Sequence, residues 1–255
     1  MNTLQIKHIN LVRANRQLLD VSNLATHSGE LIAILGPNGA GKSSLLKVIS
    51  GEWHAQVADI LIHGRSKRHW ARNQLAGHLG VLPQSSSLNF PFTVEEVVLM
   101  GAIPLALSRQ EARIKAQQLM QTTDTSQFAD RLYTSLSGGE RQRVQLARVL
   151  LQLSQAQSAP VLLLDEPLSA QDLSQQHQLM SLMQQLAHQQ QATILVVLHD
   201  LNHALRYADR IWLMNSGHLC ADGAPSDILQ PDKIAELWGY RPQLLTGEHH
   251  SAVLY

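Results

Sequence analysis

The sequence of 255 residues predicts an α/β fold, in which a helical segment is inserted into a core built on a parallel sheet. Short apolar runs at 31–35 and 161–164 lead directly into a glycine-rich and an acidic segment, as buried parallel strands do. A third such run begins at residue 192 and ends in a histidine. Between about 85 and 153 strand patterns are absent and helical spacing prevails. These observations favour a parallel α/β core over an all-β or all-helical fold.

One domain is expected over residues 1–255, with a core of about 1–84 and 154–255 and a helical subdomain of about 85–153. Before the run at 31–35, strand-like segments at 4–9 and 18–26 predict an antiparallel β portion at the N-terminus. A helix is expected directly after the glycine-rich segment, because apolar residues recur there at helical spacing.

Three helices are expected in the middle third, at 93–101, 108–122 and 140–153. The first begins with Thr93 and has Glu96 three residues later, which is the pairing of a capping box. In the last third, strands around Val161, Ile194 and Ile211 alternate with helices. The glutamine-rich stretch 171–191 carries leucines at helical spacing and predicts an amphipathic helix with a polar outer face.

The glycine-rich segment GPNGAGKSS has the form of a phosphate-binding loop between a strand and a helix. Its glycines allow backbone N–H groups to point inward, and the following helix adds the positive end of its dipole. Lys42 is expected to reach the β- and γ-phosphates of a nucleotide, and the Ser43 hydroxyl to ligate Mg²⁺. The alternative is a glycine-rich turn without a ligand. The predicted nucleotide-binding residues are Gly36, Pro37, Asn38, Gly39, Ala40, Gly41, Lys42, Ser43 and Ser44.

Polar side chains also end three other apolar runs. Asp165 and Glu166 follow one of them and are expected at the carboxyl edge of the sheet, where ligands bind in open α/β folds. Asp165 is expected to hold Mg²⁺ directly or through water, and Glu166 to polarise the attacking water. His199 is expected to contact the γ-phosphate, and Gln84 to sense the metal or the water. Taken singly, an acidic loop or a surface histidine would explain the same residues.

The composition limits the possible functions. The formal net charge is zero, so binding to nucleic acid through bulk positive charge is not expected. A single cysteine, Cys220, cannot form an internal disulfide, which fits a reducing compartment. The start of the chain lacks a secretory pattern, and no apolar run reaches the length of a membrane span. The thirteen histidines are scattered without the spacing of metal ligands.

Together with the segment LSGGERQRVQLAR, these motifs resemble the nucleotide-binding subunit of ABC transporters from about residue 4 to about residue 240. The resemblance implies a P-loop NTPase of the ABC ATPase type that uses ATP and Mg²⁺. Leu136 to Glu140 matches the family signature, which other P-loop classes lack. By position, the resemblance implies a Walker A loop at 36–44, a Q-loop glutamine at Gln84, a Walker B pair at Asp165 and Glu166, a D-loop aspartate at Asp172 and a switch histidine at His199. It assigns Glu166, His199 and Gln84 to catalysis and Ser43, Gln84 and Asp165 to Mg²⁺.

The signature implies that two copies act together. In the family, this loop binds the γ-phosphate of the ATP held by the opposite subunit, so Ser137, Gly138, Gly139 and Glu140 are expected to act in trans. The expected assembly is a symmetric, head-to-tail homodimer with two ATP molecules between the subunits. The alternative is that the segment only caps a helix.

Within the family, the chain looks most like the ATP-binding subunit of bacterial haem importers, and the subunits of siderophore and cobalamin importers are close relatives. The resemblance implies a peripheral subunit at the cytoplasmic face of the inner membrane. Its expected partners are an integral membrane permease dimer and, indirectly, a periplasmic substrate-binding protein. Rival readings are a soluble ABC ATPase acting on DNA or ribosomes and a monomeric P-loop kinase.

The sequence departs from the family pattern at two places. Gln171 replaces the leucine of the D-loop, so we expect altered packing there. The region that often supplies an aromatic platform for adenine contains none, so Val12, Arg13 or Arg16 is expected to take that role and GTP to be tolerated.

Two phenylalanines, Phe90 and Phe92, flank Pro91 in a loop that begins with the serine-rich segment 85–87. Either both rings pack into the helical subdomain, or they form an exposed apolar knob that grips a cytoplasmic helix of the permease.

Overall fold

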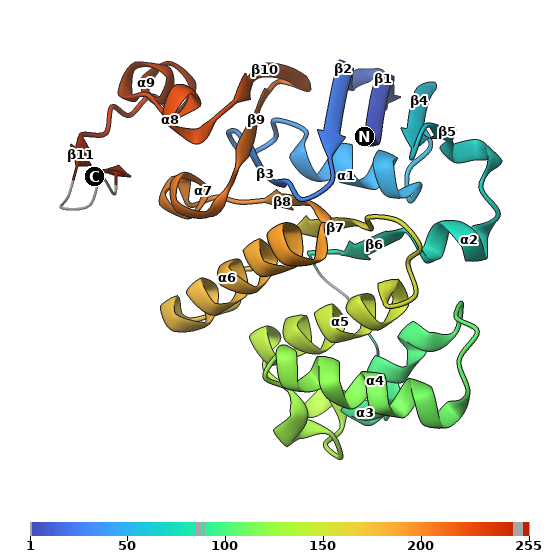
Figure 1. Cartoon of the computed structure of the whole chain (residues 1–255). Helices are drawn as coiled ribbons and strands as arrows, with labels where there is room; N and C mark the ends of the chain where they lie inside the picture. Colours follow the sequence, from blue (N-terminus) through green and yellow to red (C-terminus); the bar gives the residue numbers. More distant parts are fainter. Residues whose placement is uncertain (1, 85–87, 89, 247–251, 255) are drawn as a thin grey trace.

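The fold is built around a six-stranded sheet with the strand order β10-β9-β3-β8-β7-β6 (Figure 1). The computed structural model describes residues 2–84, 88, 90–246 and 252–254. Strands β9, β3, β8, β7 and β6 run parallel, and β10 pairs antiparallel with β9 at one edge. The strands are β3 (Leu31–Leu35), β6 (Leu79–Leu82), β7 (Val161–Asp165), β8 (Thr193–Val197), β9 (Arg210–Asn215) and β10 (His218–Gly223). The parallel α/β core that the sequence predicts is confirmed.

A second sheet confirms the antiparallel N-terminal portion. Its order is β2-β1-β4-β5, with strands β1 (Asn2–Arg13), β2 (Arg16–His27), β4 (Val57–Ile62) and β5 (Arg65–Ser66). Ala14 and Asn15 join β1 to β2 with φ angles of 48° and 58°, as in the turns that match the twist of a hairpin. Strands β4 and β5 carry no clear strand pattern in the sequence, because four of the six positions of β4 are exposed or half-exposed and β5 has only two residues.

Helix α1 (Lys42–Ser50) lies between the two sheets and carries the phosphate loop at its N-terminus. Its apolar residues are buried in a cluster that contains residues of β1, β2 and β3. The N-terminus of α1 is therefore held against the carboxyl edge of the parallel sheet. This packing places the loop opposite the ends of β7 and β8.

The C-terminus of α1 is capped by the basic loop at 63–69. The Lys67 ammonium donates to the carbonyl oxygens of Val48, at 3.1 Å, and Ile49, at 2.5 Å. Burial lowers the pKa of Lys67 to about 8. A neutral amine retains two N–H donors, so both contacts can persist after deprotonation. The basic loop thus has a structural role at the end of α1.

Lys67 gives a prediction for stability. In the unfolded chain this amine holds its proton up to its ordinary pKa of 10.5, but in the folded protein only up to about pH 8. The unfolded state binds more protons between these values, so the stability contributed at this position rises with pH in that window. The difference in unfolding free energy between wild type and Lys67→Met should rise by about 1–3 kcal/mol from pH 8 to 10.5 in urea denaturation. A difference in unfolding free energy that stays constant over this pH range would refute the effect. Lys7→Met, which removes an exposed lysine, is the control for the loss of one positive charge.

Helices α3 (Val94–Leu99), α4 (Arg109–Thr122) and α5 (Gly138–Leu153) form the helical region below the sheet (Figure 1). Capping boxes start all three helices, at Thr93, Ser108 and Ser137. Helix α5 packs on both sides, with Val144 and Leu151 in the core of the helical region and Leu146 in the core under the sheet. The three helices predicted for this region are confirmed, and α5 connects them rigidly to the sheet.

The remaining helices lie around the sheet. They are α2 (Arg72–Ala76), α6 (Leu173–Gln190), α7 (Leu201–Tyr207), α8 (Pro225–Ile228) and α9 (Pro231–Trp238), and a small hairpin is formed by β11 (Leu244–Thr246) and β12 (Ala252–Leu254). Helix α6 is the amphipathic glutamine-rich helix predicted from the sequence, with Leu179, Met183 and Leu186 buried. Across the described residues, no helix combines the length and the apolar character that crossing a bilayer would require.

Candidate functional site

The phosphate loop requires glycine at positions where its backbone approaches other chain segments. Gly36 has φ 149°, and a Cβ atom there would lie 2.1 Å from the carbonyl oxygen of Met214. Gly41 has φ 101°, and a Cβ atom would lie 2.8 Å from the Leu19 side chain. The loop is therefore clamped between β2 and β9, and its backbone N–H groups keep a fixed orientation.

Lys42 is buried at the start of α1 and points back along the loop. Its Nζ donates to the carbonyl oxygens of Gly36, at 2.7 Å, and Pro37, at 3.1 Å. Burial lowers the pKa of Lys42, although the nearby carboxylates of Glu166 and Asp165 oppose this shift. A polyphosphate beside this ammonium would further favour its charged form. Lys42 therefore has the position expected of a phosphate ligand.

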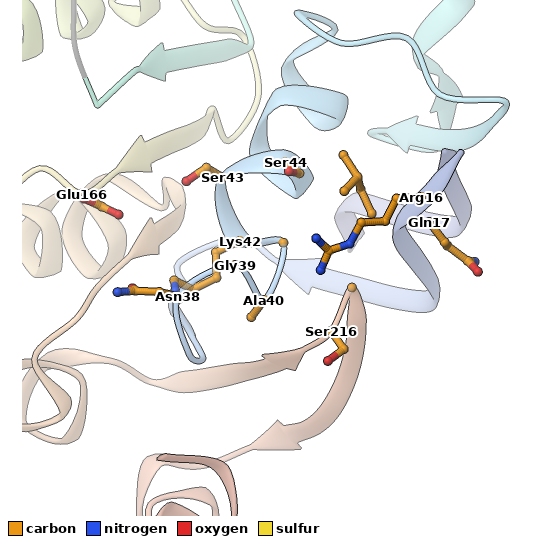
Figure 2. Close-up of a pocket in the computed structure, with 13 residues that line it drawn as sticks. Arg16, Gln17, Asn38, Gly39, Ala40, Lys42, Ser43, Ser44, Glu166 and Ser216 are labelled. Carbon is orange, nitrogen blue, oxygen red and sulfur yellow. The ribbon is translucent and has the colours of Figure 1, made fainter. Parts of the chain in front are cut away.

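A cavity of about 520 Å³ opens over the loop (Figure 2). It joins the loop to the start of β2, to Glu166 and to the turn after β9. The residues that line it are Arg16, Gln17, Leu18, Asn38, Gly39, Ala40, Gly41, Lys42, Ser43, Ser44, Glu166, Ser216 and Gly217. Seven of the nine predicted loop residues are among them; Gly36 and Pro37 lie beneath, as carbonyl partners of Lys42. Ser216 and Gly217 were missed, since a short Ser-Gly turn between two strands carries no nucleotide motif.

Ser43 and Asp165 meet although they are far apart in the sequence. The Ser43 hydroxyl donates to Asp165 Oδ1 at 2.8 Å. Burial raises the pKa of Asp165, which the hydrogen bond from Ser43 partly offsets. A hydroxyl and a carboxylate are oxygen ligands of the kind that Mg²⁺ prefers, and one or two such groups suffice when phosphates supply the rest. These residues therefore fit a magnesium ion bound together with a nucleotide.

Glu166 is the centre of the polar cluster after β7. Gln84 Nε2 donates to its Oε2 at 2.7 Å, and His199 Nε2 lies 2.6 Å from its Oε1. The backbone of Glu166 has φ 51°, a left-handed conformation that is uncommon for this residue type. Its carbonyl oxygen accepts from the Ser169 hydroxyl at 3.1 Å, which helps to hold that turn. The three residues that the sequence assigns to catalysis are thus brought together.

The signature segment is placed apart from the phosphate loop. Ser137 is the N-cap of α5, and it accepts from the Glu140 backbone N–H while the Glu140 side chain accepts from the Ser137 N–H. Gly139 packs closely, since a Cβ atom would lie 2.6 Å from the Ala170 carbonyl oxygen. None of residues 137–140 is among the described residues that line the phosphate-loop cavity. The capping role and the proposed binding role coexist, because the Ser137 hydroxyl proton stays available for donation.

The D-loop segment leads directly into α6. Asp172 caps this helix by accepting from the Gln175 backbone N–H at 2.9 Å. Gln171, which stands where the family has leucine, is buried and donates to the carbonyl oxygen of Pro167 at 3.2 Å. Gln171 therefore makes a hydrogen bond inside the turn that a leucine side chain could not make.

Arg16, out of the three candidates for the base platform, is the one that lines the phosphate-loop cavity (Figure 2). The Arg13 guanidinium lies over the ring of Trp53, 4.1 Å from its centroid. The Val12 backbone N–H donates to Gln56 Oε1 at 2.8 Å. The sequence analysis did not identify Trp53, because nothing in its local pattern links it to the first hairpin.

The Arg16 assignment gives a second prediction. Arg16→Ala should raise the Kd for both ATP and GTP by about three- to tenfold, because any base can stack on a guanidinium. Isothermal titration calorimetry with each nucleotide measures this effect. Arg13→Ala is the matched control, and a larger loss in that variant than in Arg16→Ala would refute the assignment.

Comparison with known proteins identifies relatives of the whole chain. The profile of the ABC transporter family matches residues 19–169. A hemin import ATP-binding protein of Shewanella denitrificans is 47% identical over 242 residues, covering 95% of both chains. One from Vibrio cholerae is 48% identical and covers 92% of this chain and 90% of the relative. These relatives confirm the resemblance stated from the motifs.

Solved structures agree with the fold. A chain from an inward-facing metal-chelate type ABC transporter superposes with a TM-score of 0.81 at 25% identity, covering 100% of this chain and 98% of that one. A bacterial ABC transporter cassette solved as a dimer superposes with a TM-score of 0.76 at 26% identity, covering 87% and 98%. The predicted fold class is thus confirmed in both sequence and structure.

Proposed function

The chain belongs to the ABC transporter family, in which it is an ATP-binding subunit, and from this we propose that it drives hemin import across the inner membrane. The observation that carries the proposal is identity of 47–48% with hemin import ATP-binding proteins over at least 90% of both chains. The complete set of motif residues around the phosphate loop supports the ATPase part. The alternative cargo is an iron–siderophore or cobalamin, and the likeness to a metal-chelate type transporter fits both classes.

We assign the chemical roles as follows. The loop N–H groups and Lys42 bind the β- and γ-phosphates, and Ser43, Asp165 and Gln84 hold Mg²⁺, which would neutralise charge on the phosphates. Glu166 orients and polarises the attacking water. His199 and Gln84, which now contact the Glu166 carboxylate, position that group and sense the γ-phosphate.

Two copies are needed in this proposal to complete each site. The signature residues of one subunit, Ser137 to Glu140, would close over the nucleotide of the other, with Asp172 at the contact. Separation of the signature segment from the loop cavity within one chain supports this arrangement. The dimeric cassette among the structural relatives supports it as well.

We further propose that the helical region binds a membrane permease dimer, which places the subunit at the cytoplasmic face of the membrane. Phe90 is 67% exposed and Ile103 is 81% exposed, whereas Phe92 packs against the core of the helical region. Packing into the helical region thus describes Phe92, and an exposed apolar ring describes Phe90. Residues 85–87 of the serine-rich segment lie outside the described residues.

The permease contact gives a third prediction. Phe90→Ser should reduce co-purification of the permease by about tenfold while ATP affinity stays within twofold, because a large exposed ring can anchor an interface. Pull-down of the permease from detergent extracts measures the effect. Tyr240→Ser, which removes a ring that is 61% exposed and lies near the C-terminus, is the control. Unchanged recovery in Phe90→Ser would exclude this ring from the interface.

The cargo is tested by uptake in the organism that carries the gene. Deleting the gene should abolish ATP-dependent accumulation of radiolabelled hemin, and a plasmid copy should restore it. Uptake of a labelled iron–siderophore and of labelled cobalamin is measured in the same strains. If the deletion abolishes uptake of the iron–siderophore or of cobalamin while hemin uptake stays intact, the hemin assignment is wrong. The ATPase assignment is unaffected by that result.

A further inference from the structure

A second cavity, of about 850 Å³, lies outside the nucleotide site. It is formed by α7 and the segments that pack around it, and we call it the α7 cavity. His177, Asp200, His203, Arg206, Ser226 and Val253 are among its lining residues, and it shares none with the phosphate-loop cavity. Its volume lies within the range of pockets that hold small organic ligands. Size alone thus permits a ligand of several rings.

His203 gives the α7 cavity an unused polar group. Its side chain is only 4% exposed, and its Nδ1 lies 3.2 Å from Asp200 Oδ2. Its Nε2 is buried and has no hydrogen-bond partner within the described part of the chain. A buried polar atom without a partner is unfavourable, so a ligand oxygen or nitrogen that pairs with Nε2 would be stabilised.

Aromatic rings form one wall beside this nitrogen. The His177 and His203 rings have centroids 5.0 Å apart, and the Tyr207 ring lies nearly parallel to His203, at 17° and 6.2 Å. His177 Nδ1 and the Tyr207 hydroxyl are 2.8 Å apart, which fixes the two rings against each other. Tyr207 does not line the cavity and His203 is almost fully buried, so His177 is the ring that is open to a ligand. A flat aromatic ligand is favoured there, since offset stacking adds to the burial of apolar area.

The charges around the α7 cavity favour an anion. The Asp200 carboxylate is already engaged, because it accepts from the Asn202 backbone N–H at 2.7 Å and faces His203. The Arg206 side chain is exposed, and its guanidinium lies over the Tyr207 ring, 5.4 Å from the centroid. No carboxylate within 4.0 Å is found for Arg206 among the described residues, so its charge remains for a ligand.

We propose that the α7 cavity binds a planar aromatic anion, that is, a fused-ring molecule with a carboxylate or sulfonate group. The rings of the ligand would stack on the His177 ring, and its anionic group would pair with Arg206. A polar atom of the ligand would satisfy His203 Nε2. Asp200, which lines the α7 cavity, directly follows His199 in the chain, and His199 contacts Glu166.

The test uses 8-anilinonaphthalene-1-sulfonate, a dye that fluoresces when it is bound and carries a sulfonate on a planar naphthalene ring system. Titration of the full-length, nucleotide-free protein should show one saturable site. Arg206→Gln removes the cation and should raise the Kd about tenfold, as expected for loss of one charge-assisted contact. Ser226→Phe fills the cavity from an exposed position, and its ring should raise the Kd by about tenfold or more by steric exclusion. Arg72→Gln is the matched control, because α2 and α7 lie at opposite ends of the molecule (Figure 1), and it should change the Kd less than twofold.

Circular dichroism spectra of all three variants should match the wild type, since the substituted positions are exposed. The uncharged analogue N-phenyl-1-naphthylamine should bind at least about tenfold more weakly, because it cannot pair with Arg206. Equal dye affinity in Arg206→Gln, Ser226→Phe and wild type would overturn the proposal. Equal affinity for the charged and uncharged dyes would overturn the assignment of an anion. Neither result bears on ATP hydrolysis or hemin import.

Discussion

Replacing Glu166 with glutamine is expected to lower kcat for ATP hydrolysis by about 100-fold or more, while ATP still binds. The amide keeps the size of the side chain and can still contact Gln84 and His199, but it cannot polarise water as a base does. The phosphate loop and Lys42 are untouched, so the Kd for ATP should stay within about threefold. Phosphate release assays and calorimetry measure the two quantities.

The same variant tests the paired arrangement of subunits. If each nucleotide is bound between the loop of one copy and the signature of another, slow hydrolysis should trap an ATP-bound dimer. Size-exclusion chromatography with ATP and Mg²⁺ would then show a dimer for Glu166→Gln and a monomer without nucleotide. Glu236→Gln, an exposed change on α9, is the matched control and should behave as the wild type. Normal hydrolysis by a monomeric Glu166→Gln would contradict both the role of Glu166 and the shared site.

Replacing Lys42 with alanine is expected to raise the Kd for ATP by about 100-fold or more. Each charge-assisted hydrogen bond to a phosphate is worth about 1.5–3 kcal/mol, and an ammonium in this position can make two of them. The variant also removes the Lys42 donor from the carbonyl oxygens of Gly36 and Pro37, of which Pro37 keeps the Ala40 N–H, so a lower Tm is expected as well. Calorimetry measures the affinity, and thermal unfolding shows whether the variant is folded at the titration temperature.

Lys7→Ala is the control for Lys42→Ala, because that lysine is exposed on β1 and away from the loop. ATP affinity in the control should equal that of the wild type. If Lys42→Ala is folded and binds ATP as tightly as the wild type does, the assignment of the phosphate loop to the nucleotide site is wrong. The two catalytic-site variants are distinguishable, since only Glu166→Gln should form the ATP-dependent dimer.

Much of the fold could be predicted because its elements are locally encoded. The runs at 31–35 and 161–165 are apolar at every position up to the polar end, and both are fully buried strands. The predicted helix at 93–101 begins at a capping box that is present in the structure, at Thr93 and Glu96. Strands β4 and β10 could not be predicted in this way. Strand β4 is buried only at Ile60 and Ile62 and pairs with the distant β1. Strand β10 alternates between exposed and half-exposed positions, so it lacks the apolar run of a buried strand.

The sequence by itself determined which residues are the candidates for the chemistry, since the phosphate loop, the signature and the acidic pair are each a contiguous motif with fixed spacing. The tertiary structure decided which of these residues meet. Ser43 and Asp165 are 122 positions apart and Gln84 and Glu166 are 82 apart, yet each pair is joined by a hydrogen bond. The tertiary structure also placed Arg16 in the phosphate-loop cavity, whereas the Arg13 guanidinium lies over the Trp53 ring. The physical reason is that local spacing fixes helices and strands, whereas long-range contacts follow from the strand order and from how the sheets pack around α1.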